Sequence, residues 1–231
     1  HGSRTYAIED CTPNVLELRD LLLAKSQYTL VKLSPMLDWR KAVADFDGTV
    51  REVHIVATGN ECKELLLVLG QQVHEEPSAP RVFCVNDNQR IDYDSAAYTQ
   101  GLRIGGKPLP EAKNYLYEPN ASIMKAGCFD LVEERFGVTQ VGPSSHLFVS
   151  ATPVADFPGR GFAIEAIGGM NKKDIKRLLN GTKQANIAVR NFPLTAPQLR
   201  KKLKLADGGP VYLFGTTMQG CDHVLLRTSK I

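Results

Sequence analysis

The chain has 231 residues, of which 43% are hydrophobic and 23% are charged, a composition typical of a globular protein with one large domain or two to three small ones. Its longest apolar runs, such as Leu65–Leu69, are far shorter than the roughly 20 residues that span a bilayer, and no signal-peptide pattern opens the sequence. We therefore expect a cytoplasmic protein with no membrane partner. Five scattered cysteines without a C-x-x-C pair indicate neither a disulfide framework nor a zinc site.

The net charge of +3 is distributed unevenly along the chain. Residues 171–231 hold twelve Lys and Arg against three acidic residues, a charge of +9, whereas residues 1–170 carry −6. Such segregation predicts that the C-terminal part contacts a polyanion, and without a membrane signal this favours nucleic acid over lipid. The alternative is a solvated helix face whose lysines serve solubility.

The first predicted elements are a helix over residues 15–25 and a short strand over Tyr28–Leu33. Ser34-Pro35 stops the apolar run, which is typical of a buried strand that ends in a turn. We expect it to belong to a parallel sheet with an exposed carboxyl end, where ligands collect in open α/β sheets. The candidate catalytic residues at this end are Lys32, Ser34, Pro35 and Asp38.

A second helix is predicted from Asp38 to Asp47-Gly48, followed by strands over 50–58 and 81–86. Gly59-Asn60 is either a hairpin turn into a strand over 62–69 or the N-cap of a helix, and the dipeptide favours the hairpin. An order that opens on a helix and ends in antiparallel strands indicates the second half of a doubly wound sheet. No glycine-rich strand-to-helix turn of the G-x-G type occurs in this half.

Four separated segments carry a specific resemblance. They read E-D-C-T-P-N at 9–14, V-K-L-S-P-M-L-D-W at 31–39, V-A-T-G-N-E-C-K-E-L-L at 56–66 and Y-L-Y-E-P-N-A-S-I-M-K-A-G at 115–127. In this order they resemble a bacterial family of class I S-adenosylmethionine-dependent methyltransferases with a ferredoxin-like and a THUMP-like module at the C-terminus. The resemblance covers essentially the whole chain. It implies an α/β fold, the second half of a Rossmann-like methyltransferase sheet followed by small α+β modules.

Whole members of that family have an additional N-terminal half, which holds the glycine-rich loop for S-adenosylmethionine. This sequence contains neither that loop nor the acidic D-P-A-R type segment that accompanies it. The resemblance therefore implies that the chain corresponds to the C-terminal portion of such an enzyme and is inert as a methyltransferase by itself.

Residues 87–113 have the Gly-, Pro- and polar-rich composition of a linker. A helix capped by Asn120, a helix over 129–136 and a strand over 145–152 are predicted next. The resemblance implies that Glu118, Asn120 and Lys125 face the substrate, and the alternative roles are a helix cap and solvated positions. His146 has no companion His, Cys or acidic residue at ligand spacing.

The C-terminal part predicts the pattern β-α-β-α-β-β, with helices capped by Asn171 and Thr195 and a final hairpin across Gln219-Gly220. Helical spacing gathers cations on the exposed face of the first helix, which suits binding to nucleic-acid phosphates. The candidate RNA-binding residues are Lys172, Lys173, Lys176, Arg177, Arg190, Arg200, Lys201, Lys202 and Lys204, with Arg227 and Lys230 as further cations. Phe192 and Tyr212 are candidates for base stacking, although core packing is the more common role of such residues.

The predicted domains are a partial methyltransferase domain over 1–90, a linker and ferredoxin-like module over 91–167, and a basic THUMP-like module over 168–231. The main hypothesis is the C-terminal portion of an S-adenosylmethionine-dependent RNA methyltransferase that docks structured tRNA or rRNA, with Asp10 joining the strand-end residues at the target side of the cleft. A helix cap is the alternative role of Asp10 and Asp38. Two other hypotheses stay open: a methyltransferase acting on a small molecule or protein, and a stand-alone nucleic-acid-binding module.

Overall fold

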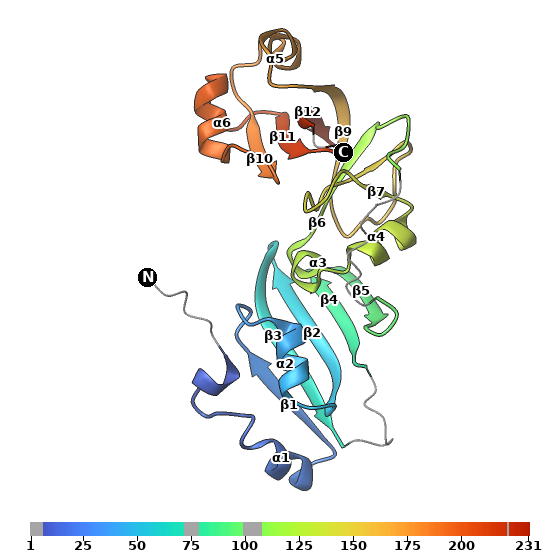
Figure 1. Cartoon of the computed structure of the whole chain (residues 1–231), viewed down its shortest axis with the longest axis vertical. Helices are drawn as coiled ribbons and strands as arrows, with labels where there is room; N and C mark the ends of the chain where they lie inside the picture. The colour runs from blue at the N-terminus through green and yellow to red at the C-terminus, as the bar shows by residue number, and fades with distance from the viewer. Residues whose placement is uncertain (1–6, 72–78, 99–107, 221) are drawn as a thin grey trace. The chain divides into compact units, whose positions relative to one another are not determined.

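The computed structural model describes residues 7–71, 79–98, 108–220 and 222–231, which form two compact units (Figure 1). The described residues up to 98, together with Asn120–Cys128, belong to the first unit, and the other described residues belong to the second. The segment Asn120–Cys128, which contains a short helix, is thus packed with the N-terminal part of the chain, although the residues on both sides of it belong to the second unit.

The first unit contains a five-stranded mixed sheet in the order β1-β3-β2-β4-β5. The elements are η1 (Ile8–Asp10), α1 (Arg19–Lys25), β1 (Tyr28–Leu33), α2 (Trp39–Asp45), β2 (Val50–Thr58), β3 (Glu61–Gly70), β4 (Arg81–Asn86), β5 (Gln89–Asp94) and α3 (Ala121–Ala126). Strands β2 and β4 are parallel, and every other neighbouring pair is antiparallel.

The hairpin between β2 and β3 forms as the sequence predicts. Gly59 has φ +58° and Asn60 has φ +63°, so both central residues are left-handed, as a type I′ turn requires. Asn-type and Gly residues tolerate this conformation best, and its twist matches that of the flanking strands.

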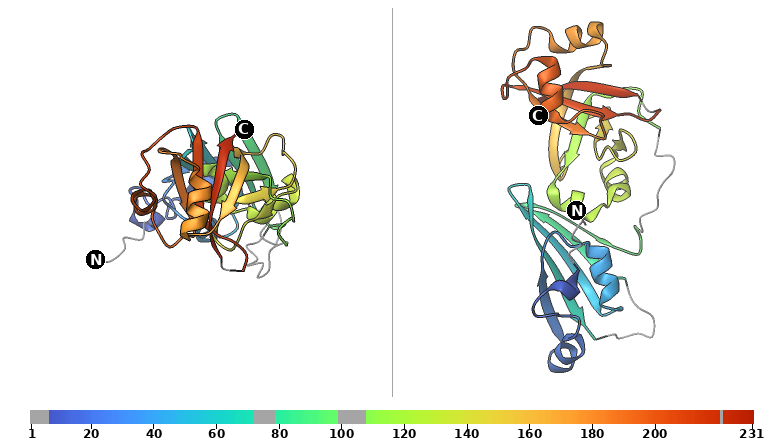
Figure 2. Two further views of the ribbon diagram at one scale, coloured as in Figure 1. Left: turned by 90° about the horizontal axis from the view of Figure 1, so that it is seen from above. Right: turned by 60° about the vertical axis from the view of Figure 1, so that its left-hand side comes forward.

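One face of this sheet forms the core of the first unit. Alternate residues of the strands, such as Ile55 and Leu67, are fully buried there. The face is covered by α2, which contributes Trp39 and Phe46, and by α3, which contacts β2, β3 and β4 and contributes Ile123 (Figure 2). The Trp39 indole and the Arg40 guanidinium both donate hydrogen bonds to the carbonyl oxygen of Ala126, which ties the two helices together.

Three sequence predictions need correction in this unit. The described neighbour of β1 is the antiparallel β3 rather than a parallel strand, because the chain turns back after β2 and places β3 between β1 and β2. Residues 89–94, assigned to a linker from their polar composition, form β5 with Ile91 and Tyr93 pointing into the core. The first helix is shorter than predicted and starts at Arg19.

The second unit contains a seven-stranded mixed sheet in the order β10-β11-β12-β9-β6-β8-β7. Its elements are β6 (Tyr115–Pro119), α4 (Phe129–Phe136), β7 (Thr139–Gln140), β8 (Phe148–Ser150), β9 (Gly159–Gly168), α5 (Lys172–Leu179), β10 (Asn186–Arg190), α6 (Ala196–Leu203), β11 (Val211–Thr217) and β12 (His223–Lys230). Only β10 and β11 form a parallel pair among these described strands. The predicted strand over 145–152 is reduced to β8.

The predicted C-terminal pattern β-α-β-α-β-β is confirmed by β9, α5, β10, α6, β11 and β12. Asn171 accepts the Asp174 N–H at 2.9 Å, and Thr195 forms a reciprocal capping box with Gln198. Leu178 of α5 and Leu199 of α6 belong to one buried cluster with Leu213 and Leu225 of the sheet. Both helices therefore cover the same face of the sheet.

The opposite face of this sheet is concave. It carries a second apolar cluster that includes Leu116, Phe162 and Phe214. In a flat sheet the four steps from β6 to β10 would separate the strands by about 19 Å, at roughly 4.8 Å a step. Yet Arg190 at the end of β10 bonds to Glu118 on β6, with 2.8 Å between guanidinium nitrogen and carboxylate oxygen. The sheet therefore curls around this cluster.

Candidate functional site

The described side-chain contacts of the residues predicted to be catalytic lie within turns, at helix starts or between neighbouring strands. Lys32 forms an ion pair with Glu64 at 2.8 Å, and the Ser34 hydroxyl accepts the Met36 N–H. Asp38 accepts the N–H groups of the first turn of α2, and Asp10 accepts the Ala7 N–H at the start of η1. These contacts match the capping alternative for the two aspartates, and a catalytic part for any of the five, including Pro35, stays a prediction.

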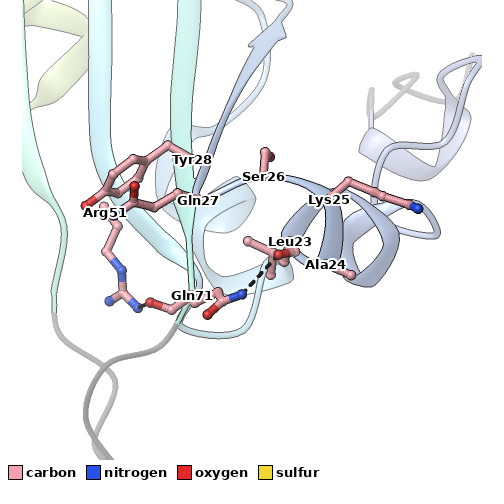
Figure 3. Close-up of a pocket in the computed structure, with 8 residues that line it drawn as sticks. All are labelled: Leu23, Ala24, Lys25, Ser26, Gln27, Tyr28, Arg51 and Gln71. Carbon is pink, nitrogen blue, oxygen red and sulfur yellow. Dashed lines mark hydrogen bonds between the residues drawn. The ribbon is translucent and has the colours of Figure 1, made fainter.

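A hollow of about 480 Å³ lies at the other end of β1 (Figure 3). It is lined by Leu23, Ala24, Lys25, Ser26, Gln27, Tyr28, Arg51 and Gln71. The Gln71 side-chain amide donates to the Leu23 carbonyl across it at 3.2 Å. Among the described residues that line the hollow there is no carboxylate. The five steps from Tyr28 to Leu33 span about 17 Å of extended strand, so the hollow is distinct from the predicted catalytic end.

The three residues expected to face a substrate are divided between the units. Asn120 caps α3 by accepting the N–H groups of Ser122 and Ile123, and its amide donates to Gln89 at 2.8 Å. Lys125 follows on the same helix and opposes the effect of burial, which raises the pKa of the Cys62 thiol. Glu118 lies instead on β6, in the second unit.

Glu118 is a buried carboxylate held by two arginines. Its side chain is only 4% exposed. One oxygen accepts from Arg160 through Nε, at 3.0 Å, and through Nη2, while the other accepts from Arg190 at 2.8 Å. The Arg160 and Arg190 side chains remain 45% and 38% exposed. The carboxylate is therefore closed off, whereas both arginine side chains are partly exposed.

His146 lies beside this cluster, in the loop between β7 and β8. Its ring stacks on Phe129 with centroids 4.4 Å apart, and its backbone is left-handed with φ +51°. Burial lowers the pKa of the imidazole, and the nearby charge of Arg190 lowers it further. Both effects favour the neutral form of the ring. The sequence offered no sign of this neighbourhood, since the partners of His146 come from distant segments.

Three buried polar atoms in this region have no hydrogen-bond partner within the described part of the chain. They are His146 Nδ1, Arg190 Nε and Thr216 Oγ1. Arg190 and Thr216 are register partners on the parallel strands β10 and β11, so they are direct neighbours on one face. Such orphaned atoms are uncommon in folded proteins and call for a water or a ligand group.

The basic residues of the C-terminal part fall into two sets. The first is a set of arginines that bind backbone and acidic groups of the fold. Arg177 donates to the Ile167 carbonyl, and Arg200 donates to the Ala185 and Ala206 carbonyls and forms an ion pair with Asp207. Arg227 donates to the Leu178 and Leu179 carbonyls at 2.9 Å and forms an ion pair with Glu165.

The second set consists of lysines on the outer surface of α5 and at α6. Exposed members are Lys172, Lys173, Lys176, Lys201, Lys202 and Lys204. None of the six is ion-paired with another described residue. Since α5 and α6 cover the same face of the sheet, we call these six lysines together the lysine face. The two aromatic candidates for stacking, Phe192 and Tyr212, are partly buried and pack against the apolar clusters.

Comparisons with known proteins match two family models to the second unit. Residues 115–158 match a family model described as a ferredoxin-like domain, and residues 159–230 match one described as THUMP domain-like. The chain therefore carries a ferredoxin-like domain followed by a THUMP-like domain. The lysine face lies wholly within the THUMP-like domain, whereas the cluster around Glu118 draws on both domains. The seven-stranded sheet runs through the two without interruption.

A solved structure matches almost the whole chain. It is the crystal structure of a "putative methyltransferase from Porphyromonas gingivalis W83", with a TM-score of 0.87 and 34% sequence identity over 98% of this chain. The present chain spans 57% of the length of that protein. A comparison with curated proteins found no match. These findings confirm the resemblance seen in the sequence as to the two domains and the likeness to a methyltransferase structure.

Two further properties concern the described residues only. No helix among them combines the length and apolar composition needed to cross a membrane. Within the same residues, no three His, Cys, Asp or Glu side chains gather in the manner of a metal site.

Proposed function

We propose that this chain is the C-terminal portion of an S-adenosylmethionine-dependent RNA methyltransferase, and that the lysine face of its THUMP-like domain docks structured RNA such as tRNA or rRNA. The observation that carries the proposal is the lysine face, with six exposed ammonium groups on two helices. Long flexible cations on one surface suit the phosphate backbone of a folded RNA. The likeness to a longer methyltransferase structure supports the enzymatic part.

The described residues offer little for a cofactor. The oxygens of Ser34 and Asp38 at the end of β1 accept hydrogen bonds in local turns, and the described residues that line the hollow at the start of β1 include no carboxylate to bind ribose hydroxyls. We therefore assign S-adenosylmethionine to the part of the parent enzyme outside this sequence and derive no methyl-transfer step here. On this proposal the chain alone is inactive.

The edge of the first sheet supports this assignment. Strand β1 has β3 as its described neighbour on one side, and Tyr28 and Leu30 are 61% and 62% exposed. An exposed apolar edge strand is a site where a further strand adds. In the proposed parent enzyme, the cofactor-binding part of the sheet continues from this edge.

The docking part is tested by fluorescence anisotropy with labelled tRNA and this chain. The charge-reversed variant K201E/K202E/K204E is expected to weaken binding at least tenfold. Its matched control is K25E/K63E, which reverses two exposed lysines of the first unit and should leave binding unchanged. Equal binding by both variants would instead favour a methyltransferase of small molecules or proteins.

The enzymatic part needs the longer parent protein. Calorimetry should show S-adenosylmethionine binding to the parent and none to this chain, and radiolabelled methyl groups should appear in tRNA or rRNA. A parent that binds the cofactor, binds RNA and methylates neither RNA would end the proposal.

A further inference from the structure

The cluster around Glu118 lies on the face of the sheet opposite to the lysine face. Side chains alternate across a strand, so Glu118 shares a face with Leu116, and Arg160 shares one with Phe162. Leu116 and Phe162 belong to the concave apolar cluster, which is separate from the cluster beneath α5 and α6. A binding site on this face is therefore independent of RNA docking by the lysines.

The cluster carries more positive charge than is required to neutralise the Glu118 carboxylate. Arg160 faces Glu118 directly in the register of β9 and β6, and this pair alone neutralises the buried charge. Arg190 adds a second cation from β10, four strands away in the sheet order. The three groups together carry +1, and the neutral His146 does not change this sum.

The positive side chains of the cluster are more exposed than its carboxylate. Both carboxylate oxygens are occupied and only 4% of the Glu118 side chain is exposed, whereas 45% of the Arg160 and 38% of the Arg190 side chain remain exposed. The two arginine side chains are therefore more accessible to an anion than the carboxylate is. Planar guanidinium groups bind phosphate through paired N–H donors, which is the geometry that distinguishes arginine from lysine.

Two residues beside the cluster have left-handed backbone conformations. His146 and Asn191, the residue after Arg190, both have left-handed backbones, with φ +51° and φ +47°. The Asn191 amide donates to the Pro143 carbonyl at 2.7 Å and so fastens the end of β10 to the loop that carries His146. Left-handed residues other than glycine often occur at ligand-binding sites, and asparagine tolerates this conformation better than histidine does. His146 Nδ1 and Thr216 Oγ1 are orphaned polar atoms beside it.

We infer that Arg160, Arg190 and His146 form a binding site for a phosphate group on the concave face of the sheet, with Glu118 holding the two guanidinium groups in place. Glu118 is then a positioning residue that also lowers the affinity, because its negative charge lies near the bound anion. The phosphate belongs either to a small phosphorylated molecule or to the phosphorylated end of an RNA.

The sign of the Glu118 effect separates this site from a merely structural ion pair. Isothermal calorimetry is done with this chain, using inorganic phosphate and adenosine monophosphate as probes. Glu118→Gln should bind phosphate about tenfold more tightly, while Arg190→Gln should bind it at least tenfold more weakly. K183Q, which changes an exposed lysine outside both the lysine face and this cluster, is the matched control and should equal the wild type.

A second readout guards against variants that fold poorly. In NMR spectra of the wild-type chain, phosphate should shift the His146 imidazole signals and raise the pKa of that ring, because a bound anion favours the imidazolium form. Tighter binding of a short RNA with a 5′-phosphate than of its 5′-hydroxyl form identifies an RNA end as the ligand. Equal binding of both, with adenosine monophosphate bound, identifies a small molecule.

The inference is overturned if millimolar phosphate leaves the His146 signals unmoved. It is also overturned if Glu118→Gln and Arg190→Gln weaken binding alike. Loss of tRNA binding in the α6 lysine variant does not bear on the phosphate site. Each of the two proposals can therefore be refuted without the other.

Discussion

Arg227 offers the sharpest separation of structural cations from docking cations. One guanidinium nitrogen, Nη1, donates to the Leu178 and Leu179 carbonyls and to the Thr182 hydroxyl, with distances of 2.8–2.9 Å. Nε forms an ion pair with Glu165 at 2.7 Å, and the side chain is only 18% exposed. These carbonyls end α5, where the helix has no internal donors for them. Arg227→Gln should therefore leave several partly buried acceptors unsatisfied.

The expected loss of unfolding free energy is about 2–4 kcal/mol, since each buried group left unpaired costs about 1–3 kcal/mol and neighbouring losses are not additive. Lys201→Gln, an exposed lysine without such contacts, should change stability by less than about 0.5 kcal/mol. The affinity of the folded protein for RNA should follow the reverse order, with Lys201→Gln weaker than wild type and Arg227→Gln unchanged.

Urea unfolding measures this, with two signals assigned to the two units. The single tryptophan, Trp39, lies in the first unit and should report an unchanged transition in the Arg227 variant. Far-UV circular dichroism reports both units and should show the shift. If Arg227→Gln keeps its stability and loses RNA affinity, the division of the basic residues into two sets is wrong.

Two further predictions concern a helix cap and a buried histidine. Asp38→Ala should lower the unfolding free energy of the first unit by about 1 kcal/mol, because the side chain accepts two N–H groups at the start of α2. The urea transition followed by Trp39 fluorescence measures this loss. An unchanged midpoint would contradict the capping role. Burial lowers the pKa of His146 in the folded state, so the unfolded chain binds more protons than the folded chain as pH falls below about 6.5. The unfolding free energy should therefore decrease from pH 7.5 to pH 5.5. In His146→Gln this decrease should be less steep. Parallel pH profiles for wild type and variant would refute that reading.

Much of the fold follows from local signals in the sequence. Gly59-Asn60 supplies the two left-handed residues of a type I′ turn, and Asn171 and Thr195 place the starts of α5 and α6 through contacts three residues away. Strand β5 was missed for a comparable local reason. Its polar composition concealed the alternation of Ile91 and Tyr93, which is the actual strand signal.

The candidate sites depend on contacts that no local pattern encodes. Glu118 meets Arg160 and Arg190 at sequence separations of 42 and 72 residues, and only the curl of the sheet brings β10 to β6. For the same reason, the sequence grouped Arg177, Arg190 and Arg200 with the lysines. Helical spacing shows which cations share a face, and it does not show which of them reach a carbonyl of the fold.

The salt dependence of RNA binding tests the docking claim most directly. If the six lysines of the lysine face each contact a phosphate, log K should fall with log salt at a slope of about −4, at about 0.7 per contact. Replacing Lys201, Lys202 and Lys204 by glutamine should reduce the slope to about −2 while Arg200 keeps its structural contacts. The account predicts this halving in anisotropy titrations between 50 and 200 mM salt, and a slope that stays near −4 in the triple variant would contradict it.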